Sequence, residues 1–259
     1  MYQIDYNAYR SVKGYGKRVR FLILHYTAEN FVTSAKLLAG DGKVSAHYLV
    51  PDPTEQTYID AGYKDMRIFN LVDENDRAWH AGVSFWAGRT NINDSSIGVE
   101  IVNLASEKDG KLVFPPYNST QIDAVKELAH NVMQRYPDIE PVHVLGHSDV
   151  APGRKKDPGA AFPWKELYEA GVGAWYDDDT KATYLSQFEK GGLPDRSEFL
   201  AHFATYGYGV AAAATDAGFH DLVQAFQLHF RQEKYDGVMD CETAAILYAL
   251  VEKYFTPTQ

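Results

Sequence analysis

The chain has 259 residues, 45% of them hydrophobic, which is enough for a sizeable buried core and excludes a generally disordered protein. Its formal net charge of -10 argues against nucleic acid and against anionic lipid as partners. The only cysteine, Cys241, excludes an internal disulfide and a cysteine-based zinc site, so histidine and carboxylate ligands would have to hold any metal.

The N-terminal residues carry no export signal that the sequence reveals. Met1 leads into YQIDYNAYRS, which lacks the apolar core of a signal peptide. No run in the chain approaches the roughly 18 apolar residues of a membrane span, so we expect none. These observations leave two alternatives open, a cytoplasmic protein and a mature fragment of an exported one.

The first two thirds of the chain alternate between expected strands and helices. Short apolar runs predict buried strands at residues 18–26, 44–50, 55–60, 96–103 and 141–147. The second and third of these runs are expected to pair as a hairpin. Amphipathic patterns with polar starts or closing glycines predict helices at residues 31–42, 119–136 and 163–171. This order predicts an α/β fold in which helices flank a mixed central β-sheet.

The last third of the chain is expected to be helical. Residues 176–194, which include an acidic run and the sequence GGLP, are interpreted as a linker. Three helical patterns follow at residues 197–208, 216–231 and 240–255. We therefore predict a larger α/β domain at 1–175 and a small three-helix domain at 195–259.

Chemistry-bearing side chains occur near the ends of the expected strands. His25 ends the first strand, His147 ends the last, and Asp157 follows ten residues later in a loop rich in proline and glycine. Two histidines and a carboxylate can form an open zinc site. Glu100, inside an apolar strand, and Lys155 are candidates for a base and an oxyanion-stabilising cation. Each residue also has a structural alternative, because a lone histidine at a strand end is most often structural.

Five ordered motifs carry a family resemblance. They are LHYTA (24–28), VSAHYLV (44–50), AWHAGVSFWAGR (78–89), NDSSIGVEI (93–101) and GHSDVAPGRKKDPGAAFPW (146–164). Together they resemble the zinc-dependent N-acetylmuramoyl-L-alanine amidases of the Amidase_2 type, the AmiD/AmpD-like enzymes, over roughly residues 18–170. This family shares its fold with peptidoglycan recognition proteins.

The resemblance implies a reaction and a set of roles. The expected reaction is hydrolysis of the amide between the lactyl group of N-acetylmuramic acid and L-alanine, in peptidoglycan or in muropeptides. His25, His147 and Asp157 resemble the ligands of Zn²⁺. Glu100 resembles the general base for the attacking water, and Lys155 the cation that stabilises the oxyanion.

The same motifs contain residues expected to bind substrate. His80 is expected to line the cleft, Trp86 to stack on a sugar and Arg89 to anchor a carboxylate. Asn93 is expected to bond the peptide backbone. The full set of expected substrate contacts is Trp79, His80, Trp86, Arg89, Asn93 and Arg154. Asp149, only two residues from His147, is expected to brace the loop rather than bind metal.

The C-terminal region carries a second resemblance. Phe226–Gln227, Asp236–Gly237 and Glu242–Thr243 resemble the pattern of a three-helix peptidoglycan-binding domain, and the alternative is a helical cap that stabilises the catalytic domain. The appended region favours the periplasm or cell envelope, with a lipid anchor in the full-length gene as one form and a cytoplasmic location as the alternative. The protein is expected to be a monomer. The competing function is a peptidoglycan recognition protein that binds muropeptides without cutting them.

Overall fold

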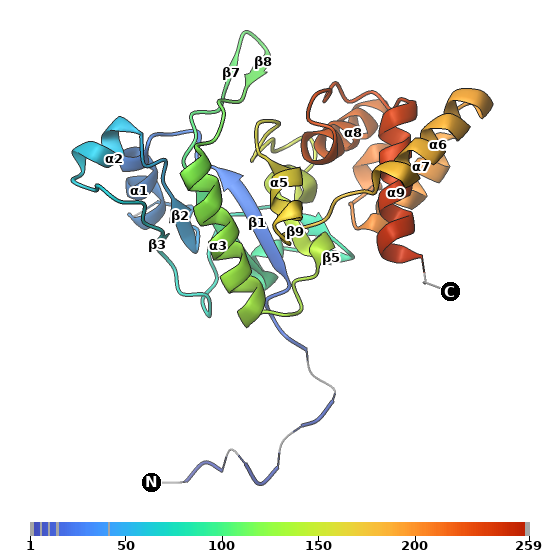
Figure 1. The fold of residues 1–259 in the computed structure, drawn as a ribbon. Coiled ribbons are helices and arrows are strands. Elements are labelled where there is room, and N and C mark those ends of the chain that lie inside the picture. The colour runs from blue at the N-terminus through green and yellow to red at the C-terminus, as the bar shows by residue number, and fades with distance from the viewer. Residues whose placement is uncertain (1–2, 6, 10, 14–15, 41, 257–259) are drawn as a thin grey trace.

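A five-stranded mixed sheet lies at the centre of the computed structural model, which describes residues 3–5, 7–9, 11–13, 16–40 and 42–256 (Figure 1). The strand order is β3 (Phe69–Asn70), β2 (Tyr48–Val50), β6 (Ser96–Ile101), β1 (Phe21–Tyr26) and β9 (Val144–Gly146). The last four strands are parallel, and β3 runs antiparallel to β2. The predicted fold class, a mixed central sheet flanked by helices, is confirmed.

Helices cover both faces of this sheet, which explains why its two longest strands, β1 and β6, are mostly apolar and buried. Helix α3 (Ser119–Arg135), capped by Asn118, shares one buried cluster with Val50 of β2. Helices α1 (Phe31–Ala39) and α2 (Gln56–Asp60) share another cluster with Leu49. Because successive strand residues point to opposite faces, α3 lies on one side of the sheet and α1 and α2 lie on the other.

The register of the parallel strands brings chemically active residues together. His25 of β1 is the neighbour of Glu100 on β6, and Leu24 is the neighbour of Gly146 at the end of β9. Helix α4 (His147–Val150) begins directly after β9. The carboxyl ends of three adjacent strands therefore present His25, Glu100 and His147 at the same edge of the sheet, where sites in such sheets form.

The predicted strand at residues 55–60 is wrong, because this segment forms α2. The Glu55 carboxylate accepts hydrogen bonds from the backbone N–H groups of Thr57 and Tyr58, which caps a helix start. Tyr58 is fully buried against α1, while β3 takes the antiparallel place beside β2. The Glu55 cap thus stabilises a helix rather than a strand in this short segment.

The remaining elements complete the chain. The short strands form two hairpins, and the shorter helices lie in the connections. They are β4 (Phe85–Trp86), β5 (Arg89–Thr90), β7 (Ser106–Lys108), β8 (Lys111–Val113), α5 (Trp164–Glu169) and the 3₁₀ helices at Ile92–Ser95, Pro141–His143 and Ala211–Ala214. Among the residues that the structure describes, no helix is both long and apolar enough to cross a membrane.

The C-terminal part is helical as predicted, but it has an additional helix. Helices α7 (Arg196–Tyr206), α8 (Asp216–Phe230) and α9 (Cys241–Phe255) occupy the three expected ranges. The range 176–194, interpreted as a linker, instead contains α6 (Asp178–Gly191), which packs beside α9 (Figure 1). The acidic run lies in the first turn of α6, where the helix dipole favours negative charge, and Phe188 packs on Tyr248 of α9.

Candidate active site

Three buried side chains converge at the carboxyl edge of the sheet. His25 Nδ1 lies 2.8 Å from Asp157 Oδ2 and 3.0 Å from His147 Nδ1, and His147 Nδ1 lies 3.0 Å from the same carboxylate oxygen. His25 comes from β1, His147 from the first residue of α4, and Asp157 from the loop that follows. The structure thus brings together the three residues that the sequence predicted as metal ligands.

The donor atoms of this cluster fit a small divalent cation. In a tetrahedral zinc site with bond lengths of about 2.0–2.2 Å, ligand atoms lie about 3.3 Å from one another, which is close to the separations here. Burial and the neighbouring His147 lower the pKa of His25 to about 4, so the ring is neutral at pH 7 and its lone pair is free. Although burial opposes it, the two histidines hold the pKa of Asp157 well below its ordinary range.

A chain of hydrogen bonds fixes the tautomer of His25. Ser96 Oγ donates to the carbonyl of Ile92 (2.7 Å), so it accepts from His80 Nε2 (3.1 Å). His80 Nδ1 is then the acceptor for His25 Nε2–H, at 3.0 Å. The lone pair of His25 Nδ1 consequently faces the metal cluster, as a ligand requires.

His147 is oriented in the same manner, by a different partner. Its Nε2 lies 3.0 Å from the carbonyl oxygen of Ala81 and 3.2 Å from Arg154 Nη2. Because the carbonyl oxygen can only accept, Nε2 donates to it at the shorter distance, which leaves Nδ1 for the cluster. The Asn93 amide oxygen accepts from the backbone N–H groups of His80 (3.1 Å) and Ala81 (2.7 Å), so it fixes the segment that orients both histidines. Gly98 leaves room for the His80 ring, because a Cβ there would lie 2.4 Å from His80 Cγ.

Replacing Ser96 by alanine should weaken zinc binding by about tenfold, since the loss of a partner behind a metal ligand typically costs 10–100-fold and Ser96 acts through His80. The measurement is competition with a chromophoric chelator on the purified chain. Ser84→Ala is the matched control, because Ser84 is also a buried serine but bonds to Gly82 and Ile92 rather than to a histidine. Equal zinc affinity of the two variants would contradict the assigned tautomer chain.

Glu100 lies beside the cluster with an unusual environment for a carboxyl group. Its Oε2 is buried and has no hydrogen-bond partner among the described residues. Burial raises the pKa of Glu100 well above its ordinary value, the Asp157 charge adds to this effect, and the Lys155 ammonium opposes it. A carboxyl group of this kind holds a proton more readily than a surface glutamate, which suits a group that takes a proton and returns it.

A pocket of about 450 Å³ opens onto these groups. Glu100, His147, Lys155 and Asp157 line its floor, and Trp79 lies at its rim with 58% of its surface exposed. The hairpin of β7 and β8 forms one wall through Ser106, Glu107 and Leu112. The pocket therefore joins a candidate metal site, a buried carboxyl, a cation and an exposed aromatic ring.

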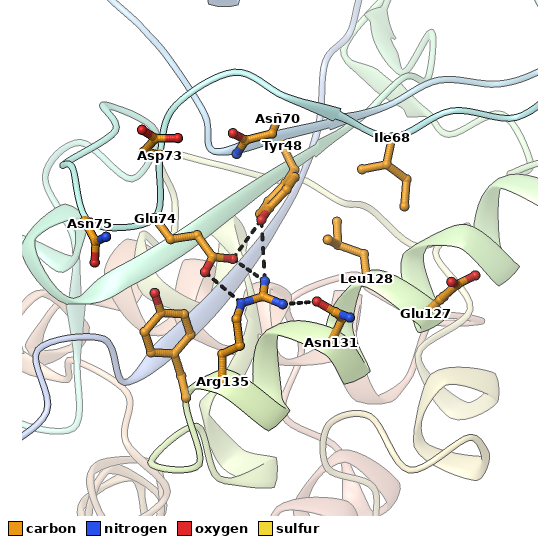
Figure 2. A pocket seen from close by; sticks show the side chains of 11 residues that line it. Tyr48, Ile68, Asn70, Asp73, Glu74, Asn75, Glu127, Leu128, Asn131 and Arg135 are labelled. Atoms are coloured by element: carbon orange, nitrogen blue, oxygen red, sulfur yellow. Dashed lines mark hydrogen bonds and ion pairs between the residues drawn. The ribbon is translucent and has the colours of Figure 1, made fainter.

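A larger hollow lies elsewhere and does not share this chemistry. It measures about 820 Å³ and lies between β2, α3 and the segment around Glu74. Figure 2 shows that its central charges pair with each other, because the Arg135 guanidinium contacts the Glu74 carboxylate and the Asn131 side chain. The Tyr48 hydroxyl also donates to Glu74, at 2.8 Å. We therefore assign the smaller pocket as the functional site.

The structure separates the expected substrate contacts into two groups. Trp79, His80 and Arg154 line the pocket, although the His80 ring is engaged with His25 and Ser96. The Arg154 guanidinium donates to the carbonyls of Ala81 (2.6 Å) and Val83 (2.7 Å), so it also holds the segment above the cluster. Asn93 is buried and its amide oxygen is occupied by the backbone, which replaces the expected peptide contact.

The expected sugar-stacking role of Trp86 is wrong. Its side chain is fully buried, and Nε1 donates to the carbonyl of Val142 at 3.1 Å. Its ring packs against Tyr206 and Tyr208 from the C-terminal region, so both faces of the indole are unavailable to a ligand. Arg89 lies exposed on β5 and is not among the residues that line the pocket.

Sequence reasoning missed two groups near the site. The β7–β8 hairpin supplies a pocket wall, and Tyr208 and His229 of the C-terminal region contact Asp149, two residues after His147. Asp149 is fully buried, as a bracing role requires, and its Oδ2 accepts from the backbone N–H of Gly146. No local motif marks Tyr208 or His229 in the sequence. What points to them is that a buried Asp149 carboxylate needs hydrogen-bond donors, which can come from distant parts of the chain.

The fold and this arrangement of side chains fit a mixed α/β enzyme of the hydrolase class with a candidate metal centre. Residues 15–160 match the Amidase_2 family, N-acetylmuramoyl-L-alanine amidase. Because the match covers more than half of the chain, the protein belongs to this family.

Similar proteins share the whole length of the chain. N-acetylmuramoyl-L-alanine amidase AmiD of Escherichia coli is 40% identical over 255 residues, which cover 98% of this chain and 89% of that protein. The crystal structure of AmpDh3 from Pseudomonas aeruginosa in complex with anhydromuramic pentapeptide has a TM-score of 0.95 and 60% identity, covering 98% and 99% of the two chains. The complex of E. coli AmiD with anhydro-N-acetylmuramic acid-L-Ala-D-γ-Glu-L-Lys has a TM-score of 0.85 and 40% identity, covering 98% and 95%.

Proposed function

We propose that the chain hydrolyses the amide between the lactyl group of N-acetylmuramic acid and L-alanine in peptidoglycan or muropeptides, with zinc held by His25, His147 and Asp157. The observation that carries the proposal is the place of Glu100 beside three converging ligand atoms, with its Oε2 buried and without a hydrogen-bond partner among the described residues. The named ligands of the AmpDh3 and AmiD complexes, both anhydromuramic peptides, support the substrate class.

The side chains in the pocket have complementary roles in this reaction. Zinc, when bound, would polarise the scissile carbonyl and make a water nucleophilic near neutral pH. The Glu100 carboxylate takes a proton from the attacking water and returns it to the departing L-alanine nitrogen. The Lys155 ammonium, whose charge acts on both His25 and Glu100, stabilises the negative oxygen of the tetrahedral intermediate.

The rim and walls of the pocket supply the binding groups. The exposed ring of Trp79 offers a face for a sugar or for the lactyl group, and the Arg77 guanidinium lies 4.5 Å from the ring centroid. Arg154 reaches the pocket from the same loop as Lys155 and is a candidate for binding a stem-peptide carboxylate. These residues would orient the scissile amide over the cluster.

The C-terminal helices fit a peptidoglycan-binding-like domain at 195–259, as the sequence motif indicates. Gln227 Nε2 donates to the Val238 carbonyl and to Thr243 Oγ1, and Gly237 N–H donates to Gln227 Oε1. The motif residues thus define the helical packing of this region. A wall-directed enzyme of this kind would act in the periplasm or cell envelope, and we propose that location.

Digestion of purified muropeptides followed by mass spectrometry tests the proposed function. With zinc present, the expected products are the free sugar acid and an intact stem peptide that begins with L-alanine. Addition of a chelator should stop their release. Unchanged substrate in the presence of zinc would instead identify a recognition protein, and cleavage between stem amino acids would identify an endopeptidase.

A further inference from the structure

Helix α8 of the C-terminal region lies along the loop that carries two of the candidate metal ligands. Residues three to five apart on α8 and just after it contact several positions within residues 146–164. Asp221 packs against Gly153, where an added Cβ would lie 2.4 Å from its carboxylate, and Gln224 accepts from Lys156. Gln232 donates to the carbonyl of Phe162 at the end of this loop. The helix therefore follows the loop along most of its length.

Asp149 is the centre of this contact. Its carboxylate is fully buried and accepts three hydrogen bonds, two of them from the C-terminal region. Tyr208 donates its hydroxyl to Oδ1 at 2.6 Å, and His229 Nδ1 lies 2.7 Å from Oδ2. The third bond comes from the backbone N–H of Gly146, at 2.8 Å. Because a buried carboxylate needs such donors, the geometry of α4 depends on side chains that lie about sixty and eighty residues away in sequence.

His229 has no other polar contact that would explain its position. Its Nε2 is buried without a partner among the described residues. Its ring is stacked on Trp164, with ring centroids 3.7 Å apart, and is 2% exposed. Trp164 begins α5, directly after the same loop. Stacking on Trp164 thus fixes the His229 ring, and the hydrogen bond from Nδ1 of this ring fixes the Asp149 carboxylate.

Helix α4 transmits this contact to both metal ligands in the loop. His147 is its first residue, and Gly146, which Asp149 binds, is its N-cap. The backbone N–H of Ser148 donates to the carbonyl of Asp157 at 2.9 Å. A shift of α4 would therefore move His147 directly and Asp157 through the backbone, away from His25 on β1.

We propose that Tyr208 and His229 are positioning residues for the metal site, and that the C-terminal helical region fixes the ligand geometry of the amidase centre. This assigns the region a role in catalysis in addition to any contact with the wall. The inference rests on one part of the proposed function, namely that the cluster of His25, His147 and Asp157 binds a metal.

The test measures the metal site of the full-length chain, using zinc affinity and the visible spectrum of the cobalt-substituted protein. Tyr208→Phe and His229→Leu each remove one donor to Asp149. Both should weaken zinc binding by about tenfold and shift the Co²⁺ absorption bands, as changes behind a ligand do. His229→Asn retains an amide donor near the Nδ1 position and should restore most of the affinity. With muropeptide as substrate, kcat should fall while KM stays unchanged.

Tyr184→Phe is the matched control, because it also removes a tyrosine–carboxylate bond, to Glu252 at 2.7 Å, within the same helical region. It should leave zinc affinity and the spectrum unchanged. Parental zinc affinity and parental Co²⁺ bands in Tyr208→Phe and His229→Leu would overturn the proposal, as would loss of sedimentation with insoluble peptidoglycan as their only effect. If His229→Leu does not fold, Tyr208→Phe, which removes a single oxygen atom, decides. The spectrum is independent of turnover, so a chain that binds metal but cuts no muropeptide would refute the proposed function alone.

Discussion

Glu100→Gln should lower muropeptide turnover by about 10²–10⁴-fold, the range in which a positioned general base contributes, while zinc affinity stays at the parental value. The amide has nearly the same shape as the carboxylate, so it fills the same place on β6. It cannot accept a proton from the attacking water, and it cannot deliver one to the leaving nitrogen. The loss should therefore appear in kcat rather than in KM.

The measurement is steady-state kinetics on a defined muropeptide, together with zinc content of the purified variant. Glu107→Gln is the matched control, because Glu107 lines the same pocket from the β7–β8 hairpin. It should change kcat by less than about tenfold, since a glutamate on the pocket wall has no proton to transfer. Retained turnover in Glu100→Gln would remove this residue from its proposed role.

Removal of the metal should lower muropeptide turnover by a factor of similar size. Chelation, or replacement of Asp157 by asparagine, should reduce hydrolysis by at least about 10³-fold, because a bound cation supplies several kcal/mol of charge stabilisation in such reactions. Asparagine lacks the negative charge with which Asp157 would partly offset the charge of the cation. Added zinc should restore activity to the chelated parent chain but not to Asp157→Asn.

Thermal unfolding gives a second measurement of the same prediction. A ligand that binds only the folded chain stabilises it by about 2.7 kcal/mol at a free concentration one hundred times Kd. The melting temperature of the parent should therefore rise with zinc, and that of Asp157→Asn should not. Asp123→Asn, which alters an exposed carboxylate on α3, is the control and should behave as the parent. A zinc-dependent rise in Asp157→Asn equal to that of the parent would exclude Asp157 as a ligand.

The sequence predicted the parts of the fold that local patterns determine. The apolar runs of β1 and β6, the amphipathic stripe of α3 and the three last helices all match their expected ranges to within a few residues. Residues 55–60 failed because alternation over so few residues does not separate a strand from a helix, and the Glu55 cap decides between them. Helix α6 was missed because its acidic start was taken as a sign of a linker.

Local strand patterns predicted that three side chains converge, and their role as metal ligands stays a prediction. His25, His147 and Asp157 follow strand ends whose register brings them together, and that register follows from the buried strands. Trp86 failed because a tryptophan in a motif gives no indication of whether another region covers it. Tyr208 and His229 could not be predicted, since their role depends on α8 lying against the loop, and no local pattern encodes that contact.

The buried residues of the sheet region and of the C-terminal helices belong to one continuous core, in which Trp86 packs on Tyr206 and Tyr208. This continuity limits how the gene can be rearranged. A catalytic half produced without the helices would expose Trp86 and leave Asp149 without two of its donors. Exchange of the helical region for an unrelated wall-binding module would do the same. Residues on the outward surface of these helices can therefore change during evolution, whereas the sheet region and the C-terminal helices have to be retained together.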